Sequence, residues 1–274
     1  VSLLTIEYDV QDGEPEDSEV YQMFPSSDEC IINILKQYKF NRNEEDYNRI
    51  ALLAGGNARI AIVLAKATIK EKNLNELKDQ ELFKRIFWQK GKFDDLLYKT
   101  AEVCSLVYSF SIDHTQEKTS EIGVLANLCD MSISNMKRNI NRLYRRQIVQ
   151  KRSDWRAVLP HALANHLAKE ALEDFGTEMI LETIDISTTH MLRSFSKRLS
   201  FLHDSKEAQE IFCAWLKLLP MTNPNVWNDV CQYRLEDAAP VIPEQILLFI
   251  ENIYKRDKGK YILDAFYEHV IVRI

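Results

Sequence analysis

The chain has 274 residues, of which 46% are hydrophobic and 28% charged, and its formal net charge is −6. This length and hydrophobic content exclude a disordered tail and allow two or more domains with their own cores. The acidic balance argues against nucleic-acid binding by the whole surface, although a local basic patch stays open.

Cysteine usage and hydropathy bear on the cellular setting. The five cysteines include no CxxC pair and no histidine partner at metal-ligand spacing, which argues against a zinc site and against a disulfide framework. No stretch reaches the roughly 20 apolar residues that a membrane-spanning helix needs. We therefore expect a cytoplasmic protein with reduced cysteines, no metal site and no membrane partner.

Residues 1–24 begin with a β-rich run, SLLTIEYDV, followed by the acidic stretch QDGEPEDSE. A single strand is not stable alone, so we expect its sheet to lie upstream and the chain to be a fragment of a longer protein. Residues 25–92 then change to helical periodicity. Four short segments with apolar faces predict a small helical domain there.

A glycine pair interrupts this helical domain in the stretch ALLAGGNARIAIVLA. Glycine costs roughly 1 kcal/mol in a helix interior, so Gly55 and Gly56 are expected to separate two helices. Asn57 is then the expected N-cap of the second helix. Arg59 falls in its first turn, where the helix dipole disfavours a cation, and this placement predicts an anionic partner for the arginine.

Residues 93–175 have the order of a winged helix-turn-helix domain. Two helical segments, FDDLLYKTAEVCSLVYSF and EIGVLANLCD, precede a third, MSISNMKRNINRLYRRQ, which Ser132 or Ser134 can cap. Two strand-like runs, IVQKR and WRAVLPH, follow and are joined at Ser153 and Asp154. Three helices and a two-stranded wing make up that layout.

The third helix and the first wing strand form a strongly basic segment. One face of the predicted helix is apolar, with Ile133, Met136, Ile140 and Leu143, and we expect its basic residues to point to the opposite side. Between residues 132 and 152 there are seven basic residues and no acidic one: Lys137, Arg138, Arg142, Arg145, Arg146, Lys151 and Arg152.

Three interpretations of this basic segment stay open. Its cations can neutralise DNA phosphates, form a solvated surface, or face an acidic neighbouring domain. If it binds DNA, Asn135, Asn139 and Asn141 are the polar residues able to read bases.

His161 stands where the second wing strand gives way to a helix. Its ring is placed either near a helix N-terminus with an anionic ligand or in a structural hydrogen bond. From residue 176 to 274 we expect a helical bundle or array interrupted by prolines. The fold class predicted for the chain is therefore mainly α, with a helical lid, a winged helix with a short β wing and a helical scaffold.

This order of elements resembles the carboxyl-terminal half of the nucleotide-binding module of AAA+ and STAND ATPases over roughly residues 1–175. In that family a helical lid packs over the nucleotide, and its sensor-2 segment lies beside the adenine and phosphates. The stretch GGNAR looks like this segment, with Ala58 where STAND proteins often have proline. The resemblance implies that Gly55, Gly56, Asn57 and Arg59 contact the nucleotide.

A second motif and the tail extend the resemblance. LPHAL looks like the Met-His-Asp motif of STAND switches, which implies that His161 touches an ADP phosphate, although Ala162 replaces the aspartate. Residues 176–274 look like the helical segments that follow the winged helix in large bacterial STAND ATPases, which act in signalling or anti-phage defence.

The Walker A pattern GxxxxGK[ST] and the Walker B acid are absent from this chain, so it is not expected to be an enzyme alone. The resemblance implies an ATPase parent that uses ATP or ADP with magnesium, while the chain alone needs no cofactor. The leading hypothesis is a regulatory fragment that controls nucleotide-dependent conformational change and assembly. Its partners would be the upstream NTPase core and further copies of the chain through lid and winged helix.

Two alternatives stay open. The first is a winged-helix DNA-binding protein that uses the basic segment on duplex DNA. The second is a passive protein-interaction scaffold built on residues 176–274, which depends on neither nucleotide nor DNA.

Overall fold

The computed structural model describes residues 26–69, 74, 79–89, 92–112, 119–159, 161–184, 187–218, 229–257 and 270. The strand expected in residues 1–24 lies outside these ranges. In chain order the elements are α1 (Asp28–Gln37), α2 (Glu44–Ala54), α3 (Ala58–Ala67), α4 (Asp79–Arg85), β1 (Trp88–Gln89), β2 (Lys92–Phe93), α5 (Asp95–Ser105), β3 (Phe110–Ser111), α6 (Glu121–Leu128), α7 (Ile133–Arg145), β4 (Val149–Arg152), β5 (Trp155–Val158), α8 (His161–Phe175), α9 (Thr177–Ile184), α10 (Thr189–Leu199), α11 (Lys206–Leu218), α12 (Asp229–Ala238) and α13 (Pro243–Asp257).

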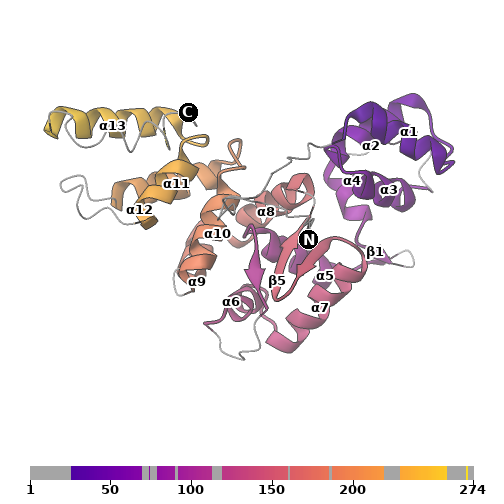
Figure 1. Cartoon of the computed structure of the whole chain (residues 1–274). Helices are drawn as coiled ribbons and strands as arrows, with labels where there is room; N and C mark the ends of the chain where they lie inside the picture. Colours follow the sequence, from indigo (N-terminus) through magenta and orange to yellow (C-terminus); the bar gives the residue numbers. More distant parts are fainter. Residues whose placement is uncertain are drawn as a thin grey trace, which may run out of the picture.

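The structure is mainly α, as the periodicity predicts, and its helices follow one another in space as in the chain. Figure 1 shows α1–α4 at one end, α5–α8 with the strands in the middle, and α11–α13 at the other end. None of the helices in the described ranges is long and apolar enough to cross a membrane. The domain boundaries proposed from the sequence, at residues 24, 92 and 175, stay a prediction.

Helices α1 to α4 form the group at residues 26–85. Ser27 caps α1 by accepting a hydrogen bond from the backbone N–H of Cys30. Asn57 caps α3 as predicted, because its side chain accepts from the N–H groups of Arg59 and Ile60 at 3.1 and 3.3 Å. The turn before it uses Gly55 at φ +53°, a left-handed conformation that ends α2.

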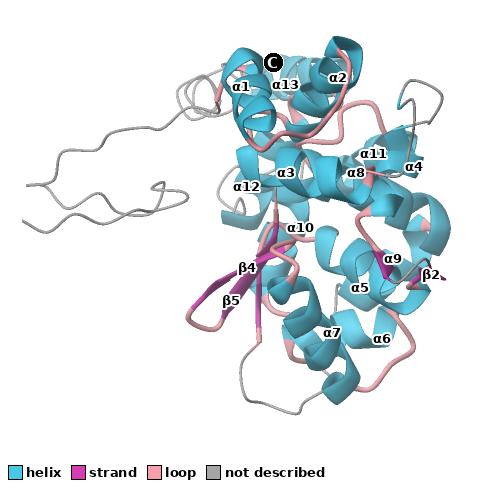
Figure 2. Cartoon of the chain, turned by 90° about the vertical axis from the view of Figure 1, so that its right-hand side faces the viewer, coloured by secondary structure: helices cyan, strands magenta, loops and turns pink. Residues whose placement is uncertain are grey.

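The middle part combines α5, α6 and α7 with a three-stranded antiparallel sheet of strand order β3-β5-β4. Ser132 caps α7, which settles the choice between the two serines. The hairpin β4–β5 turns at Ser153 and Asp154 as predicted, and Figure 2 shows it projecting from the helices. Strand β3 was not predicted: Phe110 pairs with Arg156 of β5, and a two-residue strand gains such a partner only in the folded chain.

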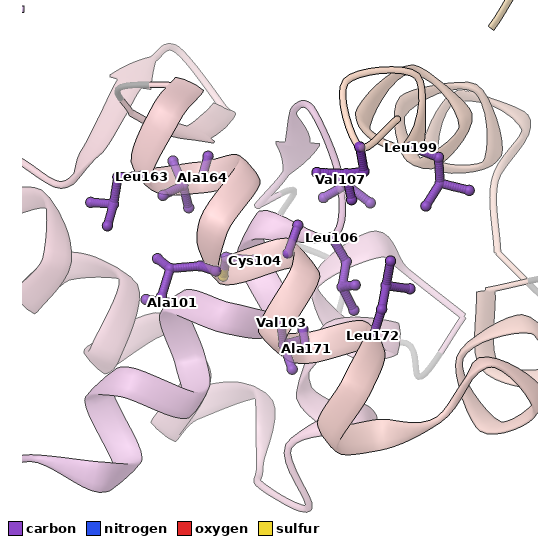
Figure 3. Packing of buried hydrophobic residues seen from close by; sticks show 14 of the residues in the cluster. Ala101, Val103, Cys104, Leu106, Val107, Leu163, Ala164, Ala171, Leu172 and Leu199 are labelled. Carbon is purple, nitrogen blue, oxygen red and sulfur yellow. The ribbon is translucent and has the colours of Figure 1, made fainter. Parts of the chain in front are cut away.

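The core centres on the packing of α8 along α5. Figure 3 shows small side chains at this contact, with Ala101 and Cys104 of α5 near Ala164 and Ala171 of α8. These four side chains are completely buried. Small residues let the two helices approach closely. Helix α8 therefore lies against α5 in the middle of the molecule, and this contact fixes the position of the chain segment just before α8.

Helices α9 to α13 form the part at residues 177–257. An edge-to-face aromatic cluster holds it together: Trp215 lies 6.0 Å from Phe195 and 5.7 Å from Phe212 between ring centroids. The guanidinium of Arg234 lies 4.2 Å from the centroid of the Trp215 ring. The two helices expected from AQEIFCAWLKLL and EQILLFIENIYKR are α11 and α13.

Candidate site at the junction of the Gly55 turn and α8

The Gly55–Asn57 turn of the α1–α4 group lies against the first turn of α8. A Cβ atom built on Gly55 would be 3.6 Å from the Cβ of Ala162. A hydrogen bond also stabilises the turn: the N–H of Ser26 donates to the carbonyl of Gly56 at 3.1 Å. Two motifs that are far apart in the sequence, GGNAR and LPHAL, therefore meet in the folded chain.

A shallow cleft of about 130 Å³ opens at this junction. Asn57, Arg59 and Ile60 line it from the α3 side. The opposite wall consists of Gln147, Val149, Gln150 and Leu159. The lining thus combines side-chain amides and apolar groups with one cation, and it contains no carboxylate among the described residues. A concave surface with a single net positive charge favours an anionic ligand.

Arg59 is the charged group of this cleft. Its side chain is exposed, and no ion pair involving it is present in the described part of the chain. The anionic partner predicted for it is therefore not found within the described ranges. The Asn57 cap fixes the backbone of Arg59 in the first turn of α3, and Arg59 lines the cleft from there.

His161 begins α8 as predicted, but its ring packs on a different side of the junction. The ring stacks on Tyr108 at 5.1 Å between centroids, with the Tyr108 hydroxyl 3.4 Å from its Nε2, and on Phe201 at 5.9 Å. It is not among the residues that line the Arg59 cleft. The structure thus joins the two motifs through Gly55 and Ala162 rather than through Arg59 and His161.

A cluster of mostly buried polar groups joins α4 to α5 and α8, and no pattern in the sequence predicts it. The carboxylate of Glu170 accepts a hydrogen bond from the Tyr98 hydroxyl and lies 3.4 Å from Lys84 Nζ of α4. Burial and the Glu170 carboxylate raise the pKa of Tyr98. The ring of Phe83 also lies 4.9 Å from that of His166. Charged residues that are scattered in the sequence carry no signal that they will meet.

In the same cluster, burial raises the pKa of Glu102 from 4.5 to about 7, helped by the nearby carboxylates of Asp174 and Glu170. Glu102 is only 5% exposed. These contacts connect the α1–α4 group to α8 at a second place, away from the Gly55–Ala162 contact.

The structure divides the seven basic residues of the 132–152 segment and corrects the expectation that they all point away from the packed side. Arg142 forms an ion pair with Asp94, which caps α5. Arg146 donates to the carbonyl of Ile86 at 3.4 Å, and burial lowers its pKa. The exposed basic residues are Arg138, Arg145, Lys151 and Arg152, while Lys137 is half-buried.

One proposed base-reading residue is also corrected. Asn139 is 4% exposed, and its amide donates to the Thr100 hydroxyl at 3.0 Å. It therefore holds α7 against α5. Asn135 and Asn141 are exposed.

The chain was compared with protein-family models, with curated proteins and with solved structures, and none of the three comparisons gave a match.

Proposed function

We propose that this chain is the lid, winged-helix and scaffold part of a nucleotide-dependent switch of the STAND type. The observation that carries the proposal is the junction described above. The Gly55–Asn57 turn lies against Ala162 of α8 there, and Arg59 presents an exposed cation in the adjoining cleft, an arrangement that suits a nucleotide-sensing lid. Helices α5, α6 and α7 followed by the β4–β5 hairpin support the winged-helix part, because their order is that of a winged helix.

The cleft fits part of a nucleotide. Its volume of about 130 Å³ is below the roughly 300 to 1,000 Å³ of a complete ligand pocket, so the other walls would come from the upstream NTPase core. The Arg59 guanidinium can bind a phosphate in a bidentate manner, and the absence of carboxylates from the described lining avoids repulsion. ATP with magnesium would supply the cleavable phosphoanhydride; the residues of this chain bind and orient it.

The switch would operate by a population shift. A nucleotide changes the equilibrium only as far as it binds one arrangement of lid and winged helix better than the other. In the arrangement seen here Gly55 of the lid lies against Ala162 of α8, and Lys84 of the lid lies near Glu170 of α8. With ADP bound, this closed arrangement would be favoured. Exchange for ATP would separate the lid from the winged helix and expose surfaces for assembly.

Arg59→Ala in the intact protein is expected to weaken ADP and ATP binding about 10-fold or more, because a hydrogen bond to a charged group contributes roughly 1.5 to 3 kcal/mol. Calorimetric titration with each nucleotide measures this, together with the ATP turnover rate. Lys66→Ala is the matched control, since Lys66 is an exposed cation in the last turn of the same helix.

Equal affinity and turnover in Arg59→Ala and the native protein would contradict the proposal. So would an upstream coding sequence without a GxxxxGK[ST] loop, because no phosphate cradle could then accompany the lid.

A further inference from the structure

Four basic residues of the neighbouring elements α7 and β4 are exposed; we call this group the basic face and define it as Arg138, Arg145, Lys151 and Arg152. Arg138 and Arg145 are seven positions apart, so at about 100° per residue they point in directions only about 20° apart. All four residues are exposed, and α7 packs directly against β4. The nucleotide junction does not use any of them.

Aromatic side chains border the basic face. Tyr144, the neighbour of Arg145, is 47% exposed, and Trp155 is 41% exposed. Trp155 stands opposite Arg152 in the β4–β5 hairpin, and its ring also packs against that of His190 at 4.3 Å between centroids. The Tyr144 hydroxyl and the Trp155 indole N–H are hydrogen-bond donors of the kind that can contact phosphate oxygens of a duplex.

Two acidic side chains of the described residues near the basic face, Asp94 and Asp154, interact with other arginines. Asp94 pairs with Arg142 on the flank that faces α5. Asp154, in the hairpin turn, interacts with Arg156, whose side chain is 8% exposed and donates to the carbonyls of Ser153 and Trp155. The segment of residues 132–152 itself contains no carboxylate side chain, although the chain as a whole is acidic.

We propose that the basic face binds duplex DNA, chiefly through its phosphates. The major groove of B-form DNA is about 12 Å wide and admits an α-helix, whereas the deep, narrow major groove of A-form RNA does not. Helix α7 has 13 residues and spans about 20 Å, enough to follow the groove with both arginines. Of the candidate base-reading residues, only Asn135 and Asn141 are exposed, so phosphate contacts outweigh base contacts. This inference is independent of nucleotide binding.

The test is fluorescence anisotropy of the intact protein with a labelled duplex of about 25 base pairs, at salt concentrations from about 50 to 200 mM. The native protein is expected to bind with an affinity that falls linearly in a double-logarithmic plot against salt. Arg138→Glu combined with Arg145→Glu should weaken binding at least about 10-fold and reduce the salt slope by about 2, since each phosphate contact contributes about 0.9. Lys206→Glu with Lys217→Glu makes the same charge change on α11 and should leave binding within about 2-fold of native.

Three outcomes would overturn the inference. The native protein could fail to bind duplex DNA at about 50 mM salt. Both double variants could lose binding equally, which would assign the effect to net charge. Single-stranded RNA could compete better than the duplex, which would assign the face to a different partner. Thermal unfolding verifies that the variants are folded, and Arg138→Gln with Arg145→Gln, which adds no repulsion, should still reduce the salt slope by about 2.

Discussion

Replacing Glu102 by glutamine is expected to stabilise the protein strongly at pH 8 and by about a quarter as much at pH 5. The pKa of this carboxyl is raised from 4.5 to about 7, chiefly by burial between α5 and α8. The carboxylates of Asp174 and Glu170 contribute to this rise, and their effect exceeds the opposite effect of Lys84 and Lys99. The folded state therefore binds the proton more tightly than the unfolded state. Stability falls as the pH rises from about 4.5 through about 7, and it stays low above that.

Glutamine has the shape of the protonated acid and cannot ionise. The gain at pH 8 is at most roughly 3 kcal/mol, since each pKa unit corresponds to about 1.4 kcal/mol. Urea unfolding at pH 5, 6, 7 and 8 measures the free energy of unfolding of variant and native protein. Glu173→Gln, on an exposed position of α8, is the control and should show no such pH dependence. A Glu102→Gln effect that is the same at all four pH values would refute the buried-carboxylate explanation.

Asp46→Ala is expected to lower the free energy of unfolding by about 3 to 5 kcal/mol, the usual cost of removing one partner of a buried ion pair. The Asp46 side chain is 1% exposed and lies 3.5 Å from Arg42, which is 6% exposed. Its other oxygen accepts a hydrogen bond from the N–H of Leu74 at 3.0 Å. Alanine would leave the guanidinium and this N–H buried with fewer partners, which loosens the α1–α4 group.

Urea unfolding at pH 7 tests this second prediction. Glu44→Ala is the matched control, because Glu44 lies in the same first turn of α2 and pairs with Lys36, but both side chains are exposed, at 70% and 44%. A surface ion pair contributes about 1 kcal/mol or less. Comparable losses in the two variants would mean that the burial of Asp46 does not govern the stability of this group.

Only part of the candidate site could be predicted from the sequence. The Gly55 turn and the Asn57 cap were predicted, because their signals are backbone conformation and hydrogen bonds within a few residues. The opposite wall of the cleft was not, since Gln147 and Leu159 approach Arg59 only when the helices pack. Likewise, His161 was predicted to begin a helix, but its stacking on Tyr108 depends on a residue that is distant in the chain.

The basic segment shows the same division. Helical periodicity correctly assigned Met136 and Ile140 to the packed side of α7. It gave no indication that Arg142 would meet Asp94, or that Asn139 would be buried against Thr100, because those partners lie on α5 and its cap. Periodicity predicts the side of a helix on which a side chain lies, but it does not predict which residues of other elements lie on that side.

By itself, then, the sequence determined the mainly α class, most helix positions, the caps of α3 and α7 and the turns at Gly55 and Ser153, since these depend on hydrogen bonds and apolar patterns among neighbours in the chain. The packing of α8 on α5 decided the rest. It brought the Gly55 turn to Ala162 and enclosed Glu102 among other carboxylates, while the packing of α7 on α5 and α6 left Arg138 and Arg145 at the surface. Burial and the approach of charges depend on which surfaces meet, and surfaces that are distant in the chain meet only in the tertiary structure.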